Sequence, residues 1–410
     1  MQHEYSYSKL LEIEKLVENP SFYICDTAVL HRNFLRFKNT IQSTYPNLGI
    51  GYSFKTNYLP YYCKMVNQWG GLAEVVSPME YELALKLKIS PKEIIYNGPI
   101  KSKDTIFYAL TNDSYLNIDS LEELQIIQDF ANTYPNKKIK IGLRCNFLLP
   151  NEKISRFGID IGDESFKQAL DTINEIRNCT LSGLHFHYSS QERSIESYKF
   201  RLTKLLEISK NLIPNFEPEY LDIGGGFFGD MSEELKSLFP YEVPTIEDYS
   251  TAIANQMNGF FPTHKTKLII EPGVALVANT MTFFAKVNNI KCINGKYFAS
   301  CNASFQTIKP SGNLKNLPIK IFLSDSTKKY YENLDFVGYT CLEYDRFYTN
   351  YCGFLNNKSF IAFENMGSYN IVFKPPFIEP SPPIITFEQG GIAILRRKET
   401  TEDIFNSFIF

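Results

Sequence analysis

Short apolar runs alternate with amphipathic helical patterns between residues 48 and 272. The apolar runs are Leu48–Phe54, Leu72–Val76, Glu93–Tyr96, Tyr115–Ile118, Ile139–Leu143, Leu181–Phe186, Tyr220–Ile223 and Lys267–Ile270. The clearest helical stretches between them are Met79–Lys88, Ser120–Thr133, Ser165–Ile176 and Tyr198–Leu212. Eight strands that alternate with helices predict an α/β fold, a (β/α)8 TIM barrel with parallel strands.

The pattern changes after Pro272. Apolar runs such as Met281–Val287, Ser359–Phe363 and Gly391–Leu395 alternate there with Gly, Pro and Asn turns, and helical periodicity fades. This texture predicts a C-terminal antiparallel β domain, and the strand-like segment Ser21–Cys25 is expected to pair with it. We therefore expect an N-terminal segment that joins the β domain (1–27), a barrel domain (28–274) and the β domain itself (275–410).

The charge of the chain is nearly balanced. Its 410 residues include 42 Lys and Arg against 45 Asp and Glu, a net charge of −3, so no nucleic-acid partner is expected. No apolar run reaches the ~18 residues of a membrane helix, and the polar N-terminus lacks the features of a signal peptide. The eight cysteines are scattered without a Cys-x-x-Cys pair, which indicates reduced thiols. A cytoplasmic enzyme without a membrane partner is expected.

Chemically active residues follow the predicted strands, at the end of the barrel where such enzymes carry their active sites. These residues are Lys55, Ser77, Asn97, Asp119, Arg144, His187, Gly224–Gly226 and Glu271. A lysine at a strand end is usually only solvated, but a desolvated lysine is the nucleophile of Schiff-base chemistry. Glu271 could merely cap a turn, or it could keep the ring nitrogen of a pyridoxal cofactor protonated. The combination favours the pyridoxal cofactor.

The glycine run Gly224–Gly226 admits more than one interpretation. Together with Gly229 it satisfies GxGxxG, but a dinucleotide site belongs in an opening βαβ unit and this run follows the seventh strand. Consecutive glycines suit a phosphate-binding loop, because bare backbone N–H groups can approach the anion. A crowded strand-to-loop turn would need glycine as well.

His185 and His187 alternate on one strand and are expected to face the same side. A His-x-His zinc pair is one interpretation. The other histidines are His3, His31 and His264, and none of them follows a barrel strand. One histidine against a cofactor ring, with the other packed or hydrogen-bonded, is therefore favoured, and no metal site is expected.

The sequence resembles the pyridoxal-phosphate-dependent decarboxylases of the alanine-racemase-like fold (fold type III), which include ornithine, diaminopimelate and arginine decarboxylases. The resemblance covers nearly the whole chain. It rests on motifs in the family's order: Tyr52-Ser-Phe-Lys-Thr-Asn57, Ala73-Glu-Val-Val-Ser-Pro-Met-Glu80, Ser155-Arg-Phe-Gly158, Gly183-Leu-His-Phe-His-Tyr-Ser-Ser190, Leu221-Asp-Ile-Gly-Gly-Gly-Phe227, Glu271-Pro-Gly273, Gly338-Tyr-Thr-Cys341 followed by Asp345, and Gly367-Ser-Tyr369.

The resemblance implies pyridoxal 5'-phosphate as cofactor and a role for each matching residue. Lys55 would be the Schiff-base lysine, Glu271 the partner of the ring nitrogen, and His187 the residue stacked on the ring. The phosphate would be held by Ser190, Gly224, Gly225, Gly226 and Tyr369, and Arg144 would belong to the network at the side of the ring. Cys341, from the β domain of a second subunit, would protonate the carbanion that remains after CO₂ leaves. A site shared in this way implies a homodimer.

Three positions depart from the family's pattern where it contacts the distal end of the substrate. Leu342 and Cys301 stand where relatives that take free diamino acids carry acidic residues, and Val274 replaces an arginine. Asp345 keeps its place in the motif and is included among the substrate-contacting positions. A shift of one residue would let Glu343 replace Leu342 as the anchor.

Three functions follow from these departures. The first is decarboxylation of an amino acid whose distal amine is masked, for example a citrate–amino-acid amide in siderophore biosynthesis, because an unpaired buried ammonium would be costly. The second is decarboxylation of a free diamino acid such as diaminopimelate, ornithine or lysine. The third is that of a catalytically inactive regulatory homologue, although Lys55, Glu271, Cys341 and Tyr369 are all present.

Overall fold

The computed structural model describes residues 5–150, 153–189, 192–310, 315–324, 327–373, 376–388 and 390–410. The chain divides into two compact units. One comprises His31–Asp230 and Tyr241–Leu276, and the other comprises Met1–Leu30, Met231–Pro240 and Val277–Phe410.

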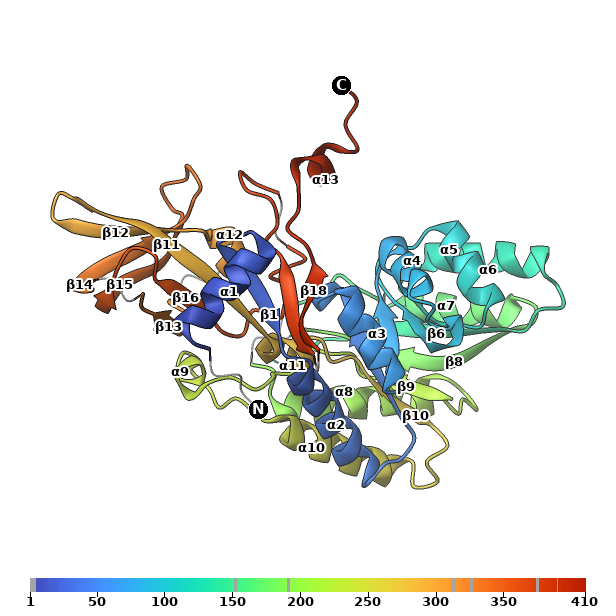
Figure 1. The fold of residues 1–410 in the computed structure, drawn as a ribbon. Coiled ribbons are helices and arrows are strands. Elements are labelled where there is room, and N and C mark those ends of the chain that lie inside the picture. Colours follow the sequence, from blue (N-terminus) through green and yellow to red (C-terminus); the bar gives the residue numbers. More distant parts are fainter. Residues whose placement is uncertain are drawn as a thin grey trace. The chain divides into compact units, whose positions relative to one another are not determined.

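The first unit is built on a closed parallel barrel. Its strands are β2 (Leu48–Ser53), β3 (Leu72–Val75), β4 (Ile94–Tyr96), β5 (Tyr115–Ile118), β6 (Ile139–Asn146), β8 (Cys179–His185), β9 (Tyr220–Asp222) and β10 (Lys267–Ile270). All neighbours run parallel, and the pairings of β5 with β6 and of β10 with β2 close the ring (Figure 1). A two-residue strand, β7 (Ile159–Asp160), is added to β6. The (β/α)8 prediction is confirmed, because each of the eight predicted runs forms one barrel strand.

Amphipathic helices follow the strands. They are α2 (Thr27–Gln42), α3 (Pro60–Gln68), α4 (Pro78–Lys86), α5 (Lys103–Thr111), α6 (Leu121–Thr133), α7 (Glu164–Glu175), α8 (Ile195–Glu207) and α10 (Ile246–Phe260), with a π-helical turn after α8 (Ile208–Leu212) and short 3-10 turns at Phe54–Thr56 and Pro91–Glu93. Side chains such as Ser77, Ser194 and Thr245 cap the first turns, as the polar residues before each apolar stripe predict. The caps fix where each helix begins and therefore where each strand-to-helix loop ends, and these loops carry the polar strand-end residues.

Tyr220 fills the barrel interior. Its ring packs with Ile95 and Ile269, and its hydroxyl donates to Asn117 Oδ1 at 2.7 Å. Two glycines leave room for it: a Cβ atom on Gly142 would lie 2.1 Å from the Tyr220 oxygen, and one on Gly183 would lie 2.3 Å from its ring. The tyrosine therefore holds Asn117 in place under the polar end of the barrel.

The second unit contains a mixed sheet. Its strands are β1 (Ser21–Cys25), β11 (Met281–Ile293), β12 (Lys296–Cys301), β13 (Ile319–Phe322), β14 (Lys329–Val337), β15 (Arg346–Leu355), β16 (Phe360–Phe363), β17 (Ile384–Glu388) and β18 (Gly391–Arg396). The order is β15-β14-β12-β11-β1-β17-β18, with β16 beside β11 and β13. The short helices are α1 (Tyr7–Val17), α9 (Glu233–Lys236), α11 (Val274–Val277, across the boundary), α12 (Phe305–Ile308) and α13 (Thr401–Phe405), with a 3-10 turn at Ala278–Thr280.

The N-terminal segment completes this sheet, as the sequence predicts. Strand β1 lies antiparallel to β11, and α1 packs Leu10, Ile13 and Val17 over the sheet. The predicted purely antiparallel sheet is only mostly so, because β1–β17 and β12–β14 pair in parallel. Both parallel pairs join strands that are distant in the chain, where no hairpin dictates direction.

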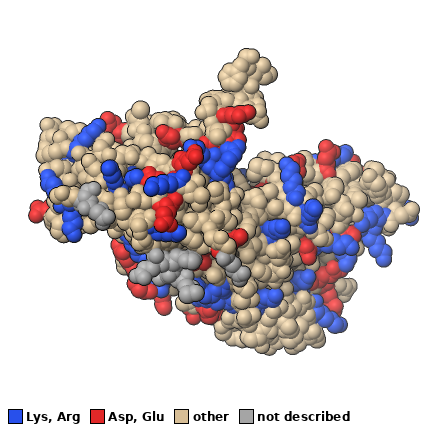
Figure 2. Space-filling model, in the orientation of Figure 1, with Lys and Arg blue, Asp and Glu red and all other residues tan. Residues whose placement is uncertain are grey.

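The surface and helices agree with the chain's balanced composition. On the face shown in Figure 2, basic and acidic residues are interspersed, and neither sign gathers in one large patch. Within the described residues, no helix has both the length and the apolar character needed to cross a membrane.

Candidate active site

Lys55 lies in the 3-10 turn directly after β2, at the polar end of the barrel. Its Nζ is 2.8 Å from Glu74 Oε2, and the Glu74 side chain is only 1% exposed. Ser53 donates its hydroxyl to the same carboxylate oxygen at 2.5 Å. A buried carboxylate thus fixes the amine at the mouth of the barrel.

An amide links this ion pair to a second buried carboxylate. Asn97 Nδ2 lies 3.1 Å from Glu74 Oε1 and 2.5 Å from Glu271 Oε1. The Asn97 side-chain oxygen accepts from Asn117 at 2.8 Å, so the chain of contacts runs down to Tyr220 in the barrel interior. Lys55 and Glu271 are therefore held in one continuous hydrogen-bonded network.

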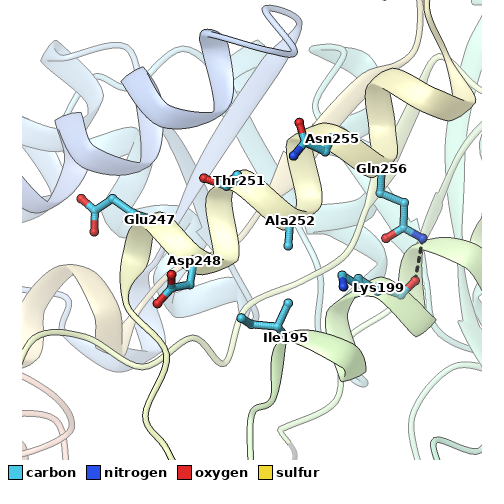
Figure 3. A pocket seen from close by; sticks show the side chains of 8 residues that line it. All are labelled: Ile195, Lys199, Glu247, Asp248, Thr251, Ala252, Asn255 and Gln256. Carbon is cyan, nitrogen blue, oxygen red and sulfur yellow. Dashed lines mark hydrogen bonds between the residues drawn. The ribbon is translucent and has the colours of Figure 1, made fainter.

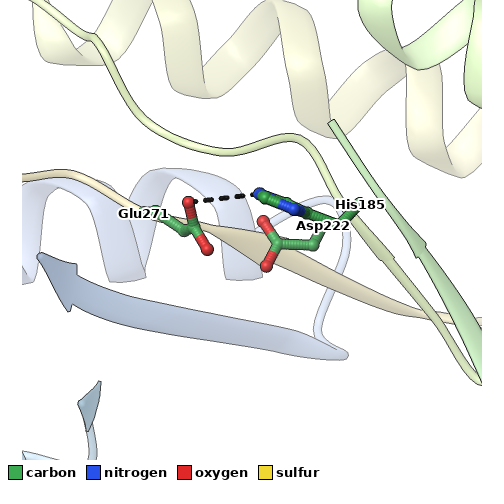
Figure 4. A group of neighbouring side chains, drawn as sticks. All are labelled: His185, Asp222 and Glu271. Carbon is green, nitrogen blue, oxygen red and sulfur yellow. Dashed lines mark ion pairs between the residues drawn. The ribbon is translucent and has the colours of Figure 1, made fainter. Parts of the chain in front are cut away.

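Glu271 also belongs to a buried group with His185 and Asp222, shown in Figure 4. One oxygen of Glu271 lies 3.6 Å from His185 Nε2, and Asp222 Oδ1 accepts from the Gly224 N–H at 2.9 Å. Burial and the neighbouring charge of Glu271 raise the pKa of Asp222 well above its usual range. Burial alone would raise the pKa of Glu271 too, but His185 and then Lys55 hold it below its ordinary value. One proton is thus kept on Asp222, and Glu271 is ionised.

Asp222→Asn should make the stability of the apoprotein less dependent on pH. The folded protein holds the Asp222 proton, which the unfolded chain releases above ~pH 4, so wild-type stability falls as pH rises toward the raised folded pKa, by up to about 1.4 kcal/mol per pH unit. Asparagine mimics the neutral acid and cannot ionise. Between pH 5 and 8, the melting temperature of the variant minus that of wild type should therefore increase as the pH rises. A constant difference would contradict a protonated Asp222.

The turn after β9 requires glycine, because its backbone is left-handed at two positions and crowded at Gly224 and Gly225. Gly224 and Gly226 have φ angles of +68° and +96°, and a Cβ on Gly225 would lie 2.0 Å from the Glu271 carbonyl oxygen. The Gly225 N–H donates to His187 Nδ1 at 3.0 Å. Burial, reinforced by the charge of Lys55, lowers the pKa of His187 well below its usual range, so its ring is neutral. The loop and the imidazole orient one another.

Arg144, at the end of β6, is held from two sides. Its Nη1 lies 2.7 Å from Asp119 Oδ1, and its guanidinium covers the Phe157 ring at 4.7 Å. The Gly158 N–H donates to the other Asp119 oxygen at 3.3 Å. The motif 155–158 therefore packs on the arginine that the resemblance predicts at the side of the cofactor ring.

The second unit carries Cys341 on an exposed loop. Asp345 organises this loop, because its carboxylate accepts from Thr340 Oγ1 at 2.6 Å, from the Thr340 N–H at 3.1 Å and from the Phe305 N–H at 2.6 Å. Leu342 is half-buried and Glu343 exposed. Asp345 is thus occupied by local donors, whereas the Glu343 side chain is accessible.

Four other predicted residues stand as follows. Cys301 is buried at the end of β12, and burial raises its pKa, so the thiol is neutral. Tyr369 has a φ of +67° and stacks on Phe373 at 5.2 Å. Val274 begins α11. Ser190 lies outside the described residues.

Sequence reasoning overlooked Glu74 and Asp222 as site residues. Each is a carboxylate inside an otherwise apolar barrel strand, in Leu-Ala-Glu-Val and Tyr-Leu-Asp, and each is buried. A charged residue rarely lies in a strand core unless it is paired, so this placement was the available signal. Asn97 and Asp119 were noticed only as strand ends.

A surface groove of about 680 Å³ lies elsewhere, between α8 and α10 (Figure 3). Gln256 crosses part of it and donates to the Lys199 carbonyl oxygen at 2.9 Å. None of the strand-end residues lines this groove. The candidate active site is therefore the polar end of the barrel.

A comparison with known protein families matches the part of the chain that forms the barrel. Residues 30–278 match the model described as "Pyridoxal-dependent decarboxylase, pyridoxal binding domain", which is more than half of the chain. The chain belongs to this family. It is an amino-acid decarboxylase, and its cofactor is pyridoxal phosphate, as the motifs predict.

Individual relatives of this decarboxylase extend over both units. Diaminopimelate decarboxylase of Aquifex aeolicus (strain VF5) is 24% identical over 395 residues, covering 92% of this chain and 90% of that protein. The L-glutamyl acyl-carrier-protein decarboxylase of Niallia circulans is 24% identical over 420 residues, with coverage of 97% and 95%. The structure of diaminopimelate decarboxylase from Helicobacter pylori with L-lysine aligns at a TM-score of 0.81 and 25% identity, covering 97% and 98% of the two chains. The structure of diaminopimelate decarboxylase from M. jannaschii aligns at a TM-score of 0.85 and 21% identity, covering 98% of this chain and 94% of that chain.

The barrel residues of the decarboxylase fit pyridoxal phosphate. The ionised Glu271, buried beside a neutral Asp222, suits a cationic ring nitrogen. The amine of Lys55 suits an aldehyde, and the left-handed turn at Gly224 and Gly226, with φ angles of +68° and +96°, suits an anion such as a phosphate.

Proposed function

We propose that this decarboxylase removes the α-carboxylate of an amino acid whose distal amine is masked, such as a citrate–amino-acid amide in siderophore biosynthesis. The observation that carries the proposal is the absence of charge at Leu342, Cys301 and Val274, together with the engagement of Asp345 by its own loop. A distal ammonium desolvated among such residues would cost several kcal/mol, of order ~3.

The roles proposed for the barrel residues follow from their contacts. Lys55 binds the aldehyde of the cofactor, and Glu74 orients its amine beforehand. Glu271 holds the ring nitrogen, while Asn97 and His185 keep the carboxylate ionised and in place. When bound, the cofactor supplies an electron sink for the charge left by the departing CO₂.

The remaining cofactor contacts are proposed from the loops at the barrel mouth. His187, kept neutral by its surroundings, covers the ring, and Arg144 stands at the ring's side. The backbone of Gly224, Gly225 and Gly226, with Ser190 and Tyr369, binds the phosphate. The left-handed backbone of Gly224 and Gly226 at this turn favours that assignment.

Cys341 is proposed to protonate the carbanion from the β domain of a second subunit, which makes the homodimer the functional unit. Its exposure on a loop braced by Asp345 supports this role. We also propose 1–27, 28–274 and 275–410 as the domain division. A cytoplasmic location is proposed because the eight cysteines are scattered along the chain without a Cys-x-x-Cys pair.

A second candidate is a decarboxylase of a free diamino acid. The exposed Glu343, next to Leu342, could anchor a distal ammonium. The diaminopimelate decarboxylases among the relatives support this candidate, whereas the Niallia circulans relative is named for a glutamyl group attached to a carrier protein, which supports a conjugated substrate.

Substrate preference separates the two candidates. With wild-type enzyme, CO₂ release from an ω-acyl ornithine should exceed that from ornithine by about 100-fold in kcat/KM, because only ornithine loses hydration of a charge without replacement. Leu342→Asp combined with Cys301→Asp should shift activity toward ornithine. Glu343→Gln is the matched test of the second candidate, which uses Glu343 as the anchor for the distal ammonium. If the masked-amine proposal holds, this variant should leave acyl-ornithine turnover unchanged. Equal rates on both substrates with wild type would favour the free diamino acid.

A further inference from the structure

Arg201 is a fully buried cation behind the glycine turn. It lies on α8, and its exposed fraction is 0%. Its neighbours on the same helix face, Tyr198, Leu202 and Leu205, are apolar or aromatic core residues. The guanidinium stacks on the Tyr198 ring at 4.3 Å. An arginine stays protonated even when buried, so this position holds a permanent positive charge.

Two backbone carbonyls receive its hydrogen bonds. Arg201 Nη1 donates to the Gly225 carbonyl oxygen at 3.2 Å, and Nη2 donates to the Tyr188 carbonyl oxygen at 2.6 Å. The Tyr198 hydroxyl donates to the same Gly225 oxygen at 3.2 Å. One rigid fork thus ties the glycine turn after β9 to the loop after β8.

Because peptide units are planar, the fork also fixes the direction of the N–H groups that follow the two carbonyls. In a trans peptide the carbonyl and the following N–H point in opposite directions. With the Gly225 and Tyr188 carbonyls turned toward Arg201, the N–H groups of Gly226 and Ser189 point away from it. These two segments are close together, because a Cβ atom on Gly226 would lie 4.0 Å from the Ser189 Cα. Arg201 therefore turns a pair of neighbouring N–H donors toward one side.

The charge acts across the loop as well. After burial and the charge of Lys55, Arg144 and Arg201 are among the groups that lower the pKa of His187, whose ring accepts from the Gly225 N–H. Glu271 opposes this effect, so Arg201 contributes a positive charge beside a buried carboxylate.

We propose that Arg201 is a positioning residue for phosphate recognition: it orients the N–H groups of Gly226 and Ser189 toward the cofactor's phosphate and supplies a fixed positive charge behind them. This inference rests on the proposed function, and it names a determinant of cofactor affinity on a helix outside the strand-end motifs. Arg201 is fully buried and its fork is bonded to the carbonyls of Gly225 and Tyr188, so its effect should depend on the phosphate.

The test compares pyridoxal phosphate with pyridoxal, which lacks the phosphate. Each is titrated into apoprotein and followed by the absorbance band that borohydride abolishes. Arg201→Met should weaken binding of pyridoxal phosphate by about 10- to 100-fold and leave that of pyridoxal within about 3-fold. Inorganic phosphate should compete with pyridoxal phosphate less well in the variant. Lys204→Met, which removes an exposed cation paired with Glu207 from the same helix, is the matched control and should change neither affinity.

The outcomes separate this inference from a structural role and from the proposed function. If Arg201→Met leaves the ratio of the two affinities unchanged, the inference is overturned. An equal loss of affinity for both compounds is one such result, and it indicates a fold defect. If Arg201→Met gives no cooperative melting transition, Arg201→Lys decides: it keeps the charge but not the fork, and an unchanged ratio there overturns the inference. Wild type that forms no borohydride-sensitive band with either compound contradicts the proposed function itself.

Discussion

Lys55→Ala is expected to abolish both the borohydride-sensitive absorbance band and turnover, lowering kcat by about 10³-fold or more. No other amine is ion-paired to Glu74 within the described residues, so nothing replaces the nucleophile. A measurable band in the variant would mean that the cofactor is bound elsewhere.

The Lys55 variant also leaves Glu74 buried without its cation, and this is expected to cost about 3 kcal/mol of stability. The double variant Lys55→Ala/Glu74→Gln should recover most of the melting temperature and none of the activity. Lys267→Ala is the matched control, because this lysine lies at the start of β10 and contacts the Tyr115 hydroxyl. Its activity should stay near wild type. A colourless wild-type protein would favour the inactive regulatory homologue.

Glu271→Gln is expected to lower kcat by about 10³-fold while the fold survives, because removal of one preorganised charge at a reacting centre has effects of that size. Glutamine keeps the shape and can still accept from Asn97, but it cannot balance a protonated ring nitrogen. The absorbance maximum of the bound cofactor should shift, since the ring nitrogen loses its proton. Unchanged turnover would mean that Glu271 does not face this nitrogen.

A second buried carboxylate controls for this change. Glu80 is buried on α4 and accepts from the Val76 N–H at 2.9 Å, and burial raises its pKa to about 7. Glu80→Gln removes a carboxylate of similar burial and should keep kcat within about 3-fold, since surface and scaffold changes outside the reacting centre cost stability rather than rate. A loss equal to that of Glu271→Gln would indicate that the barrel, and not the ring contact, was damaged.

The sequence alone was sufficient for the barrel, the family and the cofactor. Short continuous apolar runs separated by helical stripes leave few folds that bury both faces of each strand, and all eight runs form barrel strands. Lys55, His187, the glycine turn and Glu271 follow those strands, and Arg144 lies near the end of one. Parallel strands bring their carboxyl ends to one face, so these residues share it. The exact cofactor contacts of these residues stay predictions.

Only the tertiary structure decided which polar groups meet. Glu74, Asn97 and Glu271 are distant in the chain. Their hydrogen bonds form because the closed barrel brings β3 and the ends of β4 and β10 close together. Burial and the charge of Glu271 raise the pKa of Asp222, while His185 and Lys55 hold that of Glu271 low against its burial, and no local sequence pattern contains these proximities. Arg201 reads in the sequence as one more charge on an amphipathic helix, yet packing buries it against two carbonyls of distant loops. Hydrophobic periodicity is a local property and predicts elements, whereas pairing of buried charges depends on distances that exist only after the elements pack.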